Sequence, residues 1–218
     1  MKIEKIVCGQ MAANCYLVYE KRGGDCIVID PGDEADFIMG KIEGLELKPK
    51  AILATHGHFD HIMAVNEIKL YYKIPFLIHK EDEKLLSWMR KSAVHFTGVD
   101  PGPQPEADRY LKNNLKLRIK NEKFVIMHTP GHTPGGVCFL FKDEGVLFSG
   151  DTIFANGTVG RTDLPYSNGE YLKKSVEKIL RLPGETIIYP GHGEETTVGQ
   201  ERKLLNTKKF SKGRDLGK

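Results

Sequence analysis

The sequence predicts an α/β sandwich, in which two mostly antiparallel or mixed β-sheets pack face to face and helices cover both outer faces. The 218-residue chain has an ordinary globular composition, with 40% hydrophobic and 28% charged residues. Short β-branched or aromatic segments fall into two halves, and each half is followed by segments with helical spacing. A chain of this length buries roughly 70% of its unfolded surface, which is enough for a core without disulfides.

The first half begins with three short strands separated by turn residues, which predict an antiparallel meander. A helix with Asp33 as its N-cap follows, and two further strands then alternate with two helices. We expect strands at 2–8, 15–19, 25–29, 51–55 and 75–78, and helices at 34–43, 62–72 and 81–90. Segment 92–108 contains three prolines and is predicted to be a long irregular loop, a kind that is usually functional or mobile.

The second half contains a hairpin and ends in helices. We expect strands at 115–119, 124–128, 137–141, 146–149 and 186–189, and helices at 170–180 and 197–205. These elements predict one domain over residues 1–205. Residues 206–218 contain five bases and one acid and are expected to form a flexible basic tail.

Charge and hydropathy limit the classes of partner. The net charge of +3 comes mainly from the tail, so the near-neutral remainder argues against a nucleic-acid-binding face. No apolar run exceeds five residues, whereas a membrane span needs about 18. The N-terminus lacks the apolar stretch of a signal peptide, so we expect a cytoplasmic protein with reduced, buried cysteines. The oligomeric state stays open.

Four side chains of metal-binding type stand within six residues in the stretch THGHFDH. They are His56, His58, Asp60 and His61. Imidazole and carboxylate groups suit zinc, iron and manganese. Because the stretch follows a strand, the first two histidines can turn toward one point while the other two side chains face a second point nearby. Gly57 permits a tight backbone between the two histidines.

Three more side chains of this type follow apolar strands in the same way, each beside a glycine. They are His132, Asp151 and His192. If these strand ends lie at one edge of the sandwich, seven metal ligands converge there. His79 and His95 are expected to have no role at this site, and His128 is expected to be a structural neighbour of it.

Several longer stretches surround these side chains: IDPG (29–32), THGHFDH (55–61), TPGHTPG (129–135), SGDTIF (149–154), GRTD (160–163) and PGHG (190–193). With these stretches the chain resembles the metallo-β-lactamase-fold hydrolases, and in particular the glyoxalase II group (hydroxyacylglutathione hydrolases) in its short form. The stretches span nearly the whole chain. Only residues 193–218 follow His192, so we expect this chain to lack the C-terminal region that contacts glutathione in the longer members.

The resemblance implies an αββα sandwich with two divalent metal ions, zinc by expectation, with iron or manganese also compatible. His56, His58 and His132 would bind the first ion, and Asp60, His61 and His192 the second. Asp151 would bridge the two ions. Asp60 and Asp151 are thus the carboxylates at the reacting centre, where they act as ligands rather than as the primary general base.

The resemblance also implies the reaction, which is cleavage of a small-molecule thioester of the S-2-hydroxyacylglutathione kind by a metal-bound hydroxide. One alternative is a mononuclear iron persulfide dioxygenase of the same superfamily, which would use His56, His132 and Asp151. A nuclease is disfavoured by the near-neutral charge. Three residues, Asp30, Thr55 and Thr133, either orient ligands or cap turns. Arg161 either contacts an anionic substrate or braces its loop against Asp163, and we favour bracing.

Overall fold

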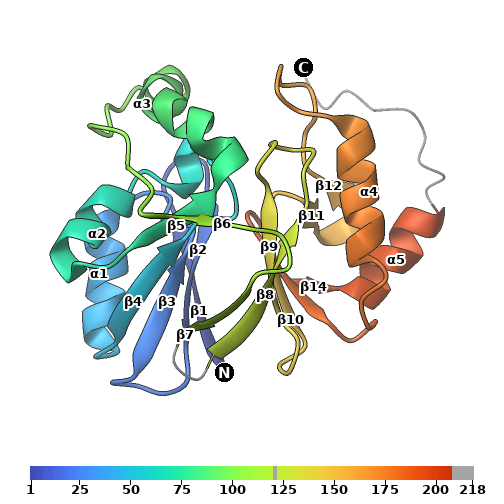
Figure 1. The fold of residues 1–218 in the computed structure, drawn as a ribbon, viewed down its shortest axis with the longest axis horizontal. Helices are drawn as coiled ribbons and strands as arrows, with labels where there is room; N and C mark the ends of the chain where they lie inside the picture. The colour runs from blue at the N-terminus through green and yellow to red at the C-terminus, as the bar shows by residue number, and fades with distance from the viewer. Residues whose placement is uncertain (120–121, 208–218) are drawn as a thin grey trace.

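The computed structural model describes residues 1–119 and 122–207, and it shows two six-stranded sheets packed face to face with helices on both outer sides (Figure 1). The predicted fold class is confirmed. The end of the expected basic tail, residues 208–218, lies outside the described residues. Among the residues described, no helix has the length and apolar character needed to cross a membrane.

The first sheet comes from the first half of the chain. Its strands lie in the order β1 (Lys2–Cys8), β2 (Ala13–Tyr19), β3 (Asp25–Ile29), β4 (Lys48–Leu53), β5 (Phe76–His79) and β6 (Arg109–Leu111). The first three strands form the predicted antiparallel meander, and β3 to β6 run parallel. The helices of this half are α1 (Ala35–Gly44), α2 (Val65–Tyr72) and α3 (Glu83–Thr97), with short 3-10 turns η1 (Phe59–His61) and η2 (Lys80–Asp82).

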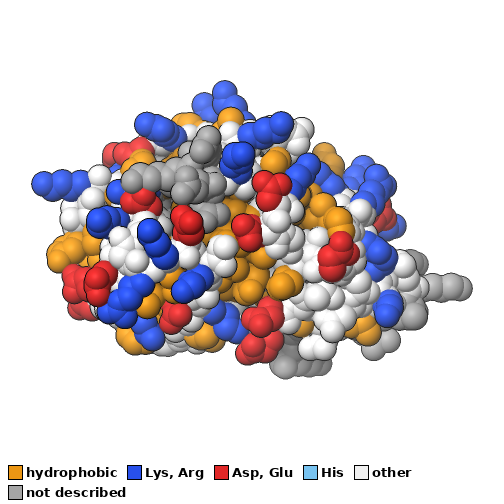
Figure 2. Space-filling model, turned by 90° about the horizontal axis from the view of Figure 1, so that it is seen from below, with side chains coloured by type: hydrophobic (Ala, Val, Ile, Leu, Met, Phe, Trp, Pro, Cys, Tyr) orange, Lys and Arg blue, Asp and Glu red, His pale blue; other side chains and the backbone are white. Residues whose placement is uncertain are grey.

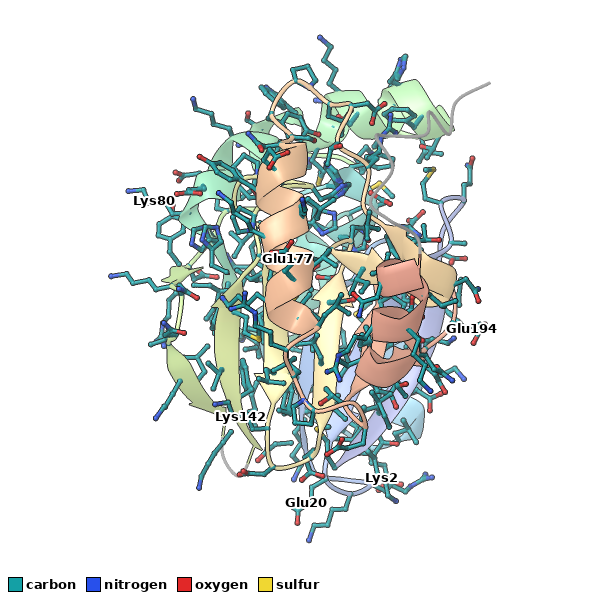
Figure 3. The ribbon with its side chains drawn as sticks, turned by 90° about the vertical axis from the view of Figure 1, so that its right-hand side faces the viewer. Lys2, Glu20, Lys80, Lys142, Glu177 and Glu194 are labelled. Atoms are coloured by element: carbon teal, nitrogen blue, oxygen red, sulfur yellow. The ribbon has the colours of Figure 1, made fainter. Side chains whose placement is uncertain are left out.

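The second sheet has the order β14 (Thr196–Thr197), β13 (Ile187–Pro190), β10 (Val146–Gly150), β9 (Val137–Phe141), β8 (Glu122–His128) and β7 (Lys116–Ile119). A small hairpin of β11 (Ile153–Phe154) and β12 (Thr158–Val159) surrounds the turn η3 (Ala155–Gly157). Helices α4 (Gly169–Ile179) and α5 (Val198–Thr207) cover the outer face of this sheet (Figure 3).

The packing of the sheets follows from the two-residue period of a strand. Every residue of β2 is buried, and alternate side chains enter different cores. Tyr16 and Val18 point between the sheets, where they meet an aromatic cluster that includes Phe148, whereas Leu17 packs beneath the helices of the first half. This close packing gives the two sheets a fixed relation, so loops at their common edge can be held at atomic distances.

Several expected boundaries are wrong. Helix α3 extends to Thr97, beyond the expected end at Arg90, because Ala93 is buried and the Phe96 ring stacks on Phe59 with centroids 5.7 Å apart. The helix ends at Gly98, whose φ of 73° is left-handed. The irregular segment is therefore shorter than expected.

The start of α1 also differs from the expected one. Asp33 does not cap it: the N-cap is Glu34, without a side-chain capping bond. Helix α5 runs to Thr207, two residues into the expected tail. The short strands β6, β11, β12 and β14 were not expected.

The surface seen from below carries acidic and basic side chains side by side (Figure 2). This is the end of the sandwich opposite the strand ends that the predicted site residues follow. Lys2, Glu20 and Lys142 lie at the lower end in Figure 3. All four cysteines are free and buried, as expected.

Candidate metal centre

The seven predicted site residues lie together at the carboxyl ends of strands from both sheets. The loop after β4 carries His56 and His58 and leads into η1 with Asp60 and His61. His132, Asp151 and His192 follow β8, β10 and β13 of the second sheet. The expected convergence of strand ends is therefore what brings these side chains to one place.

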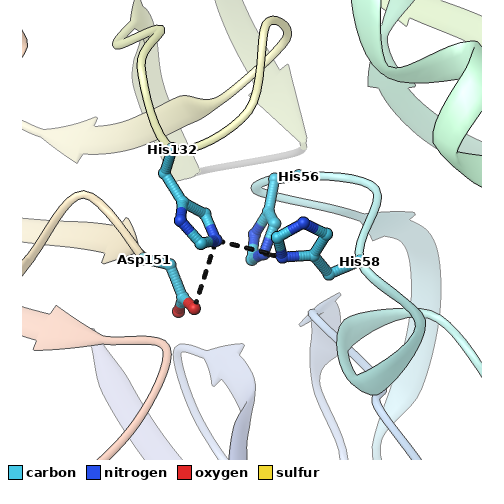
Figure 4. A group of neighbouring side chains, drawn as sticks. All are labelled: His56, His58, His132 and Asp151. Carbon is cyan, nitrogen blue, oxygen red and sulfur yellow. Dashed lines mark hydrogen bonds and ion pairs between the residues drawn. The ribbon is translucent and has the colours of Figure 1, made fainter. Parts of the chain in front are cut away.

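His56, His58 and His132, here called the first group, face one another across the seam between the sheets (Figure 4). The Nδ1 atom of His58 lies 3.1 Å from Nε2 of His56 and 3.0 Å from Nε2 of His132. Two nitrogen ligands of one tetrahedral zinc ion stand about 3.3 Å apart when each Zn–N distance is about 2.0–2.1 Å. The spacing thus fits three nitrogen ligands around one metal ion.

Asp60, His61 and His192, here called the second group, lie beside the first. The Nε2 atom of His192 is 3.3 Å from Nε2 of His61 and 3.3 Å from Oδ2 of Asp60. The rings of His56 and His61 lie only 4.2 Å apart between centroids. The structure therefore holds two adjacent groups of side chains, each able to hold a metal ion.

Asp151 stands between the two groups. Its Oδ2 atom is 3.5 Å from Nε2 of His132 and 3.6 Å from Nε2 of His192, and its Oδ1 atom is 3.5 Å from Nε2 of His61. Oδ1 is buried and has no hydrogen-bond partner among the described residues. A buried carboxylate oxygen without a donor is costly, and a cation is the natural partner for it.

A glycine beside Asp151 makes this close approach possible. A Cβ atom on Gly191 would lie 2.1 Å from Oδ1 of Asp151, so no other residue fits there without displacing the carboxylate. The donor set, the unsatisfied oxygen and this close packing all fit metal ions held by these residues.

Each histidine of the two groups uses one ring nitrogen for an outer hydrogen bond and turns the other inward. Four of them anchor Nδ1 and direct Nε2 to the centre: His56 to Thr55 Oγ1 at 3.0 Å, His61 to Asp30 Oδ2 at 3.1 Å, His132 to the Arg161 carbonyl at 2.9 Å and His192 to the Ala12 carbonyl at 3.2 Å. His58 is the exception: its Nε2 atom lies 2.8 Å from the Tyr166 hydroxyl, and Nδ1 faces inward. Such outer partners fix the tautomer and orientation of metal-binding histidines.

The predicted supporting residues act in this outer layer. The Thr55 hydroxyl donates to Asp30 Oδ2 at 2.6 Å, so it accepts from Nδ1–H of His56. The interpretation of Asp30 and Thr55 as orienting residues is supported. Thr133 instead donates to Asp82, and neither Asp82 nor Tyr166 was anticipated, since no short motif marks them.

The C-terminal part of the site rests on the second strand of the chain. The Asn14 N–H donates to the Gly191 carbonyl at 2.7 Å, and its side-chain amide donates to the carbonyls of Pro190 and Gly193. The Tyr16 hydroxyl also donates to the Pro190 carbonyl, at 2.6 Å. The loop that carries His192 is thus bound to β2, far away in sequence.

The electrostatics of the two groups differ. Burial, together with the neighbouring histidines, lowers the pKa of His56 and of His58 well below the usual value. Burial would also lower the pKa of His61, but the carboxylates of Asp151, Asp60 and Asp30 outweigh it and raise that pKa to about 10. Burial opposes the ionisation of Asp60, yet the histidines around it hold its pKa below the usual range.

Two other histidines lie outside the centre, as expected. The rings of His79 and His128 stack with centroids 4.3 Å apart and planes 13° apart, near Glu81. Arg161 forms two hydrogen bonds of 2.7 Å to Asp163, which confirms the bracing interpretation.

Comparisons with known proteins agree with the fold. The profile of the Metallo-beta-lactamase superfamily matches residues 8–192. The chain is 35% identical to the hydroxyacylglutathione hydrolase GloC of Haemophilus influenzae, covering 95% of this chain and 100% of that protein. It is also 35% identical to the probable metallo-hydrolase YqgX of Bacillus subtilis, covering 93% and 95% of the two chains.

Two solved structures are similar over nearly their whole length. BLEG-1, a B3 metallo-beta-lactamase, superposes with a TM-score of 0.84 at 36% identity, covering 93% of this chain and 97% of that one. TTHA1623 in a di-iron-bound form gives a TM-score of 0.84 at 35% identity, covering 92% and 98%. This chain therefore belongs to the metallo-beta-lactamase superfamily.

Proposed function

We propose that this protein is a dinuclear metal-dependent hydrolase that cleaves small-molecule thioesters of the 2-hydroxyacylglutathione kind. The observation that carries the proposal is the position of Asp151, whose two oxygens face two adjacent groups of metal-binding side chains. His56, His58 and His132 would hold one ion, and Asp60, His61 and His192 the other. Asp151 would bridge them and offset the repulsion between two cations.

Two zinc-type ions, when bound, lower the pKa of a water molecule to about 7 and polarise a carbonyl group. The protein's own contribution is to fix the ligands and to exclude bulk water. His56 and His61 are buried, with relative exposures of 2% and 0%. Asp60 and Asp151 act as ligands, so the reaction needs neither of them as the primary general base.

The thioester as substrate is supported by the relative named as a hydroxyacylglutathione hydrolase and by the resemblance in the motifs around the centre. A single iron ion, as in the persulfide dioxygenase alternative, would leave the second group without a role. The second group is assembled about as closely as the first. The Nε2 atoms of His61 and His192 are 3.3 Å apart in the second group, and Nδ1 of His58 is 3.0 Å from Nε2 of His132 in the first. We therefore favour two ions.

The test is thiol release from S-lactoylglutathione under anaerobic conditions, with protein loaded separately with Zn²⁺, Mn²⁺ and Fe²⁺. We expect hydrolysis with two ions per chain, and none by His58→Ala protein. Oxygen uptake with glutathione persulfide at one iron per chain, without thioester cleavage, would replace the proposal by the dioxygenase. Cleavage of a chromogenic cephalosporin without cleavage of the thioester would instead indicate β-lactamase activity, as the name of BLEG-1 states for that protein.

A further inference from the structure

Asp82 lies outside the metal centre but contacts both loops that carry the first group. It ends η2, immediately before α3, and its side chain is completely buried. An aspartate at a helix N-cap usually accepts a hydrogen bond from the first turn of that helix. Asp82 occupies the N-cap of α3 without such a bond, so its carboxylate is directed elsewhere.

Three donors from two loops meet this carboxylate. The Gly57 N–H donates to Oδ2 at 2.9 Å, and Gly57 lies between His56 and His58. The Thr133 hydroxyl donates to Oδ2 at 2.8 Å and the Gly135 N–H donates to Oδ1 at 2.5 Å, both from the loop that carries His132. The first loop belongs to the first sheet and the second loop to the second sheet.

The packing around these bonds is tight. A Cβ atom on Gly135 would lie 2.7 Å from the Asp82 backbone nitrogen, and one on Gly57 would lie 2.9 Å from Cβ of Leu85. A buried carboxylate needs all its donors to offset its lost hydration, so each bond fixes the loop that supplies it. The seam that Asp82 spans is the one crossed by the 3.0 Å contact between His58 and His132.

We propose that Asp82 is a positioning residue for the first metal position, because its carboxylate sets the distance between the His56–His58 loop and the His132 loop. The inference rests on the proposed metal centre but not on the identity of the substrate. Asp30 has a corresponding place on the other side of the stretch THGHFDH. Its carboxylate accepts a hydrogen bond from the Thr55 N–H and contacts Nδ1 of His61. Two buried aspartates after parallel strands thus support the motif from both sides, and Asp82 supports the first group.

The substitution Asp82→Asn removes one hydrogen bond between this side chain and a loop N–H, with almost no change in side-chain volume. Asparagine offers one acceptor oxygen, so its NH₂ group must face either the Gly57 N–H or the Gly135 N–H. Glu201 supplies a matched control. It is completely buried and accepts two backbone N–H groups, from Asn156 and Gly157, and the Thr196 hydroxyl, but none of these donors lies within three residues of the centre.

The experiment measures Zn²⁺ affinity by chelator competition in two backgrounds, His192→Ala to report the first position and His58→Ala to report the second. Adding Asp82→Asn should weaken the first position by about 10–100-fold, the range for outer partners of metal ligands, and change the second by less than about 3-fold. Glu201→Gln should lower the thermal stability of the metal-free protein without this selective loss.

Equal weakening of both positions by Asp82→Asn, or a loss no larger than that of Glu201→Gln, would overturn the proposal. Should Asp82→Asn fail to fold, Thr133→Val provides the milder variant, since it removes one donor and leaves both amide bonds. It should weaken the first position in the same selective way but less. Unchanged affinity in that variant would also count against Asp82. Because no substrate is involved, failure of the proposed thioesterase activity would leave this test intact.

Discussion

The first and second groups lie side by side but are built by different means. In the first group, three histidines are held by neutral partners: the Thr55 hydroxyl, the Tyr166 hydroxyl and the Arg161 carbonyl. In the second group, His61 has Asp30 on its outer side and Asp60 and Asp151 on its inner side. The difference shows how one edge of the sandwich can provide two candidate metal positions that differ in charge. They also differ in how strongly protons compete with a metal ion for the histidine nitrogens.

This contrast follows from where the carboxylates lie. Lowered pKa values leave His56 and His58 neutral at pH 7, in the form that binds a metal. His61, with its pKa raised to about 10, carries a proton at the same pH until a metal ion replaces it. Asp151 contacts histidines of both groups.

The largest loss of metal affinity should come from Asp151→Asn, which weakens both positions and so removes the difference between them. Its oxygens face both groups, so each position should lose more than about 100-fold in metal affinity, beyond the range for outer partners, and hydrolysis should be lost with the metal. Metal content after dialysis, measured together with kcat, checks this. Two retained ions with only an altered pH–rate profile would show that Asp151 acts as a base and does not bridge.

Asp60→Asn should separate the two positions. Asp60 contacts His192 and His61 at the second position, so that affinity should fall more than about 10-fold while the first changes less than about 3-fold. Stepwise chelator competition resolves the two affinities. Metal content that falls to zero in this variant would mean that the positions are not separable.

Proton release should distinguish the positions in the His58→Ala and His192→Ala backgrounds. At pH 7.5, metal binding at the second position should expel about one proton from His61, so its apparent affinity should rise about tenfold per pH unit toward pH 10. His56 and His58 should contribute no proton at the first position. Titration calorimetry in buffers of different ionisation enthalpy counts the protons. Equal proton numbers would contradict the electrostatic contrast.

The smallest effect should come from Tyr166→Phe, which removes one neutral partner from the first group. The hydroxyl is protonated at neutral pH, because burial raises the pKa of Tyr166 to about 12, and it lies 2.8 Å from Nε2 of His58. The first position should weaken about 10-fold, at the lower end of the range for outer partners, with the second unchanged. The same chelator competition measures it, and Tyr171→Phe is a control on an exposed tyrosine.

The gathering of the seven site residues was predictable from patterns that the sequence displays directly. Five of them stand beside a glycine shortly after a strand, namely His56, His58, His132, Asp151 and His192, and Asp60 and His61 complete the stretch THGHFDH. The layer around them was predicted only in part, through Asp30 and Thr55. Asp82 and Tyr166 belong to no motif, and their partners Gly57 and His58 are distant in sequence. Likewise, the end of α3 depends on Phe96 meeting Phe59, a tertiary contact that overrides the local pattern.

The bonds from Asn14 and Tyr16 to the 190–193 loop also have a consequence for a chain under synthesis, because the order of the residues along the sequence sets the order in which the two proposed metal positions can be completed. All ligands of the first position have been translated once Asp151 is made, whereas His192 emerges more than forty residues later. Its loop must then find strand β2, which was among the first segments to leave the ribosome. The second position is therefore completed last, by the contact that also joins the beginning of the chain to its end.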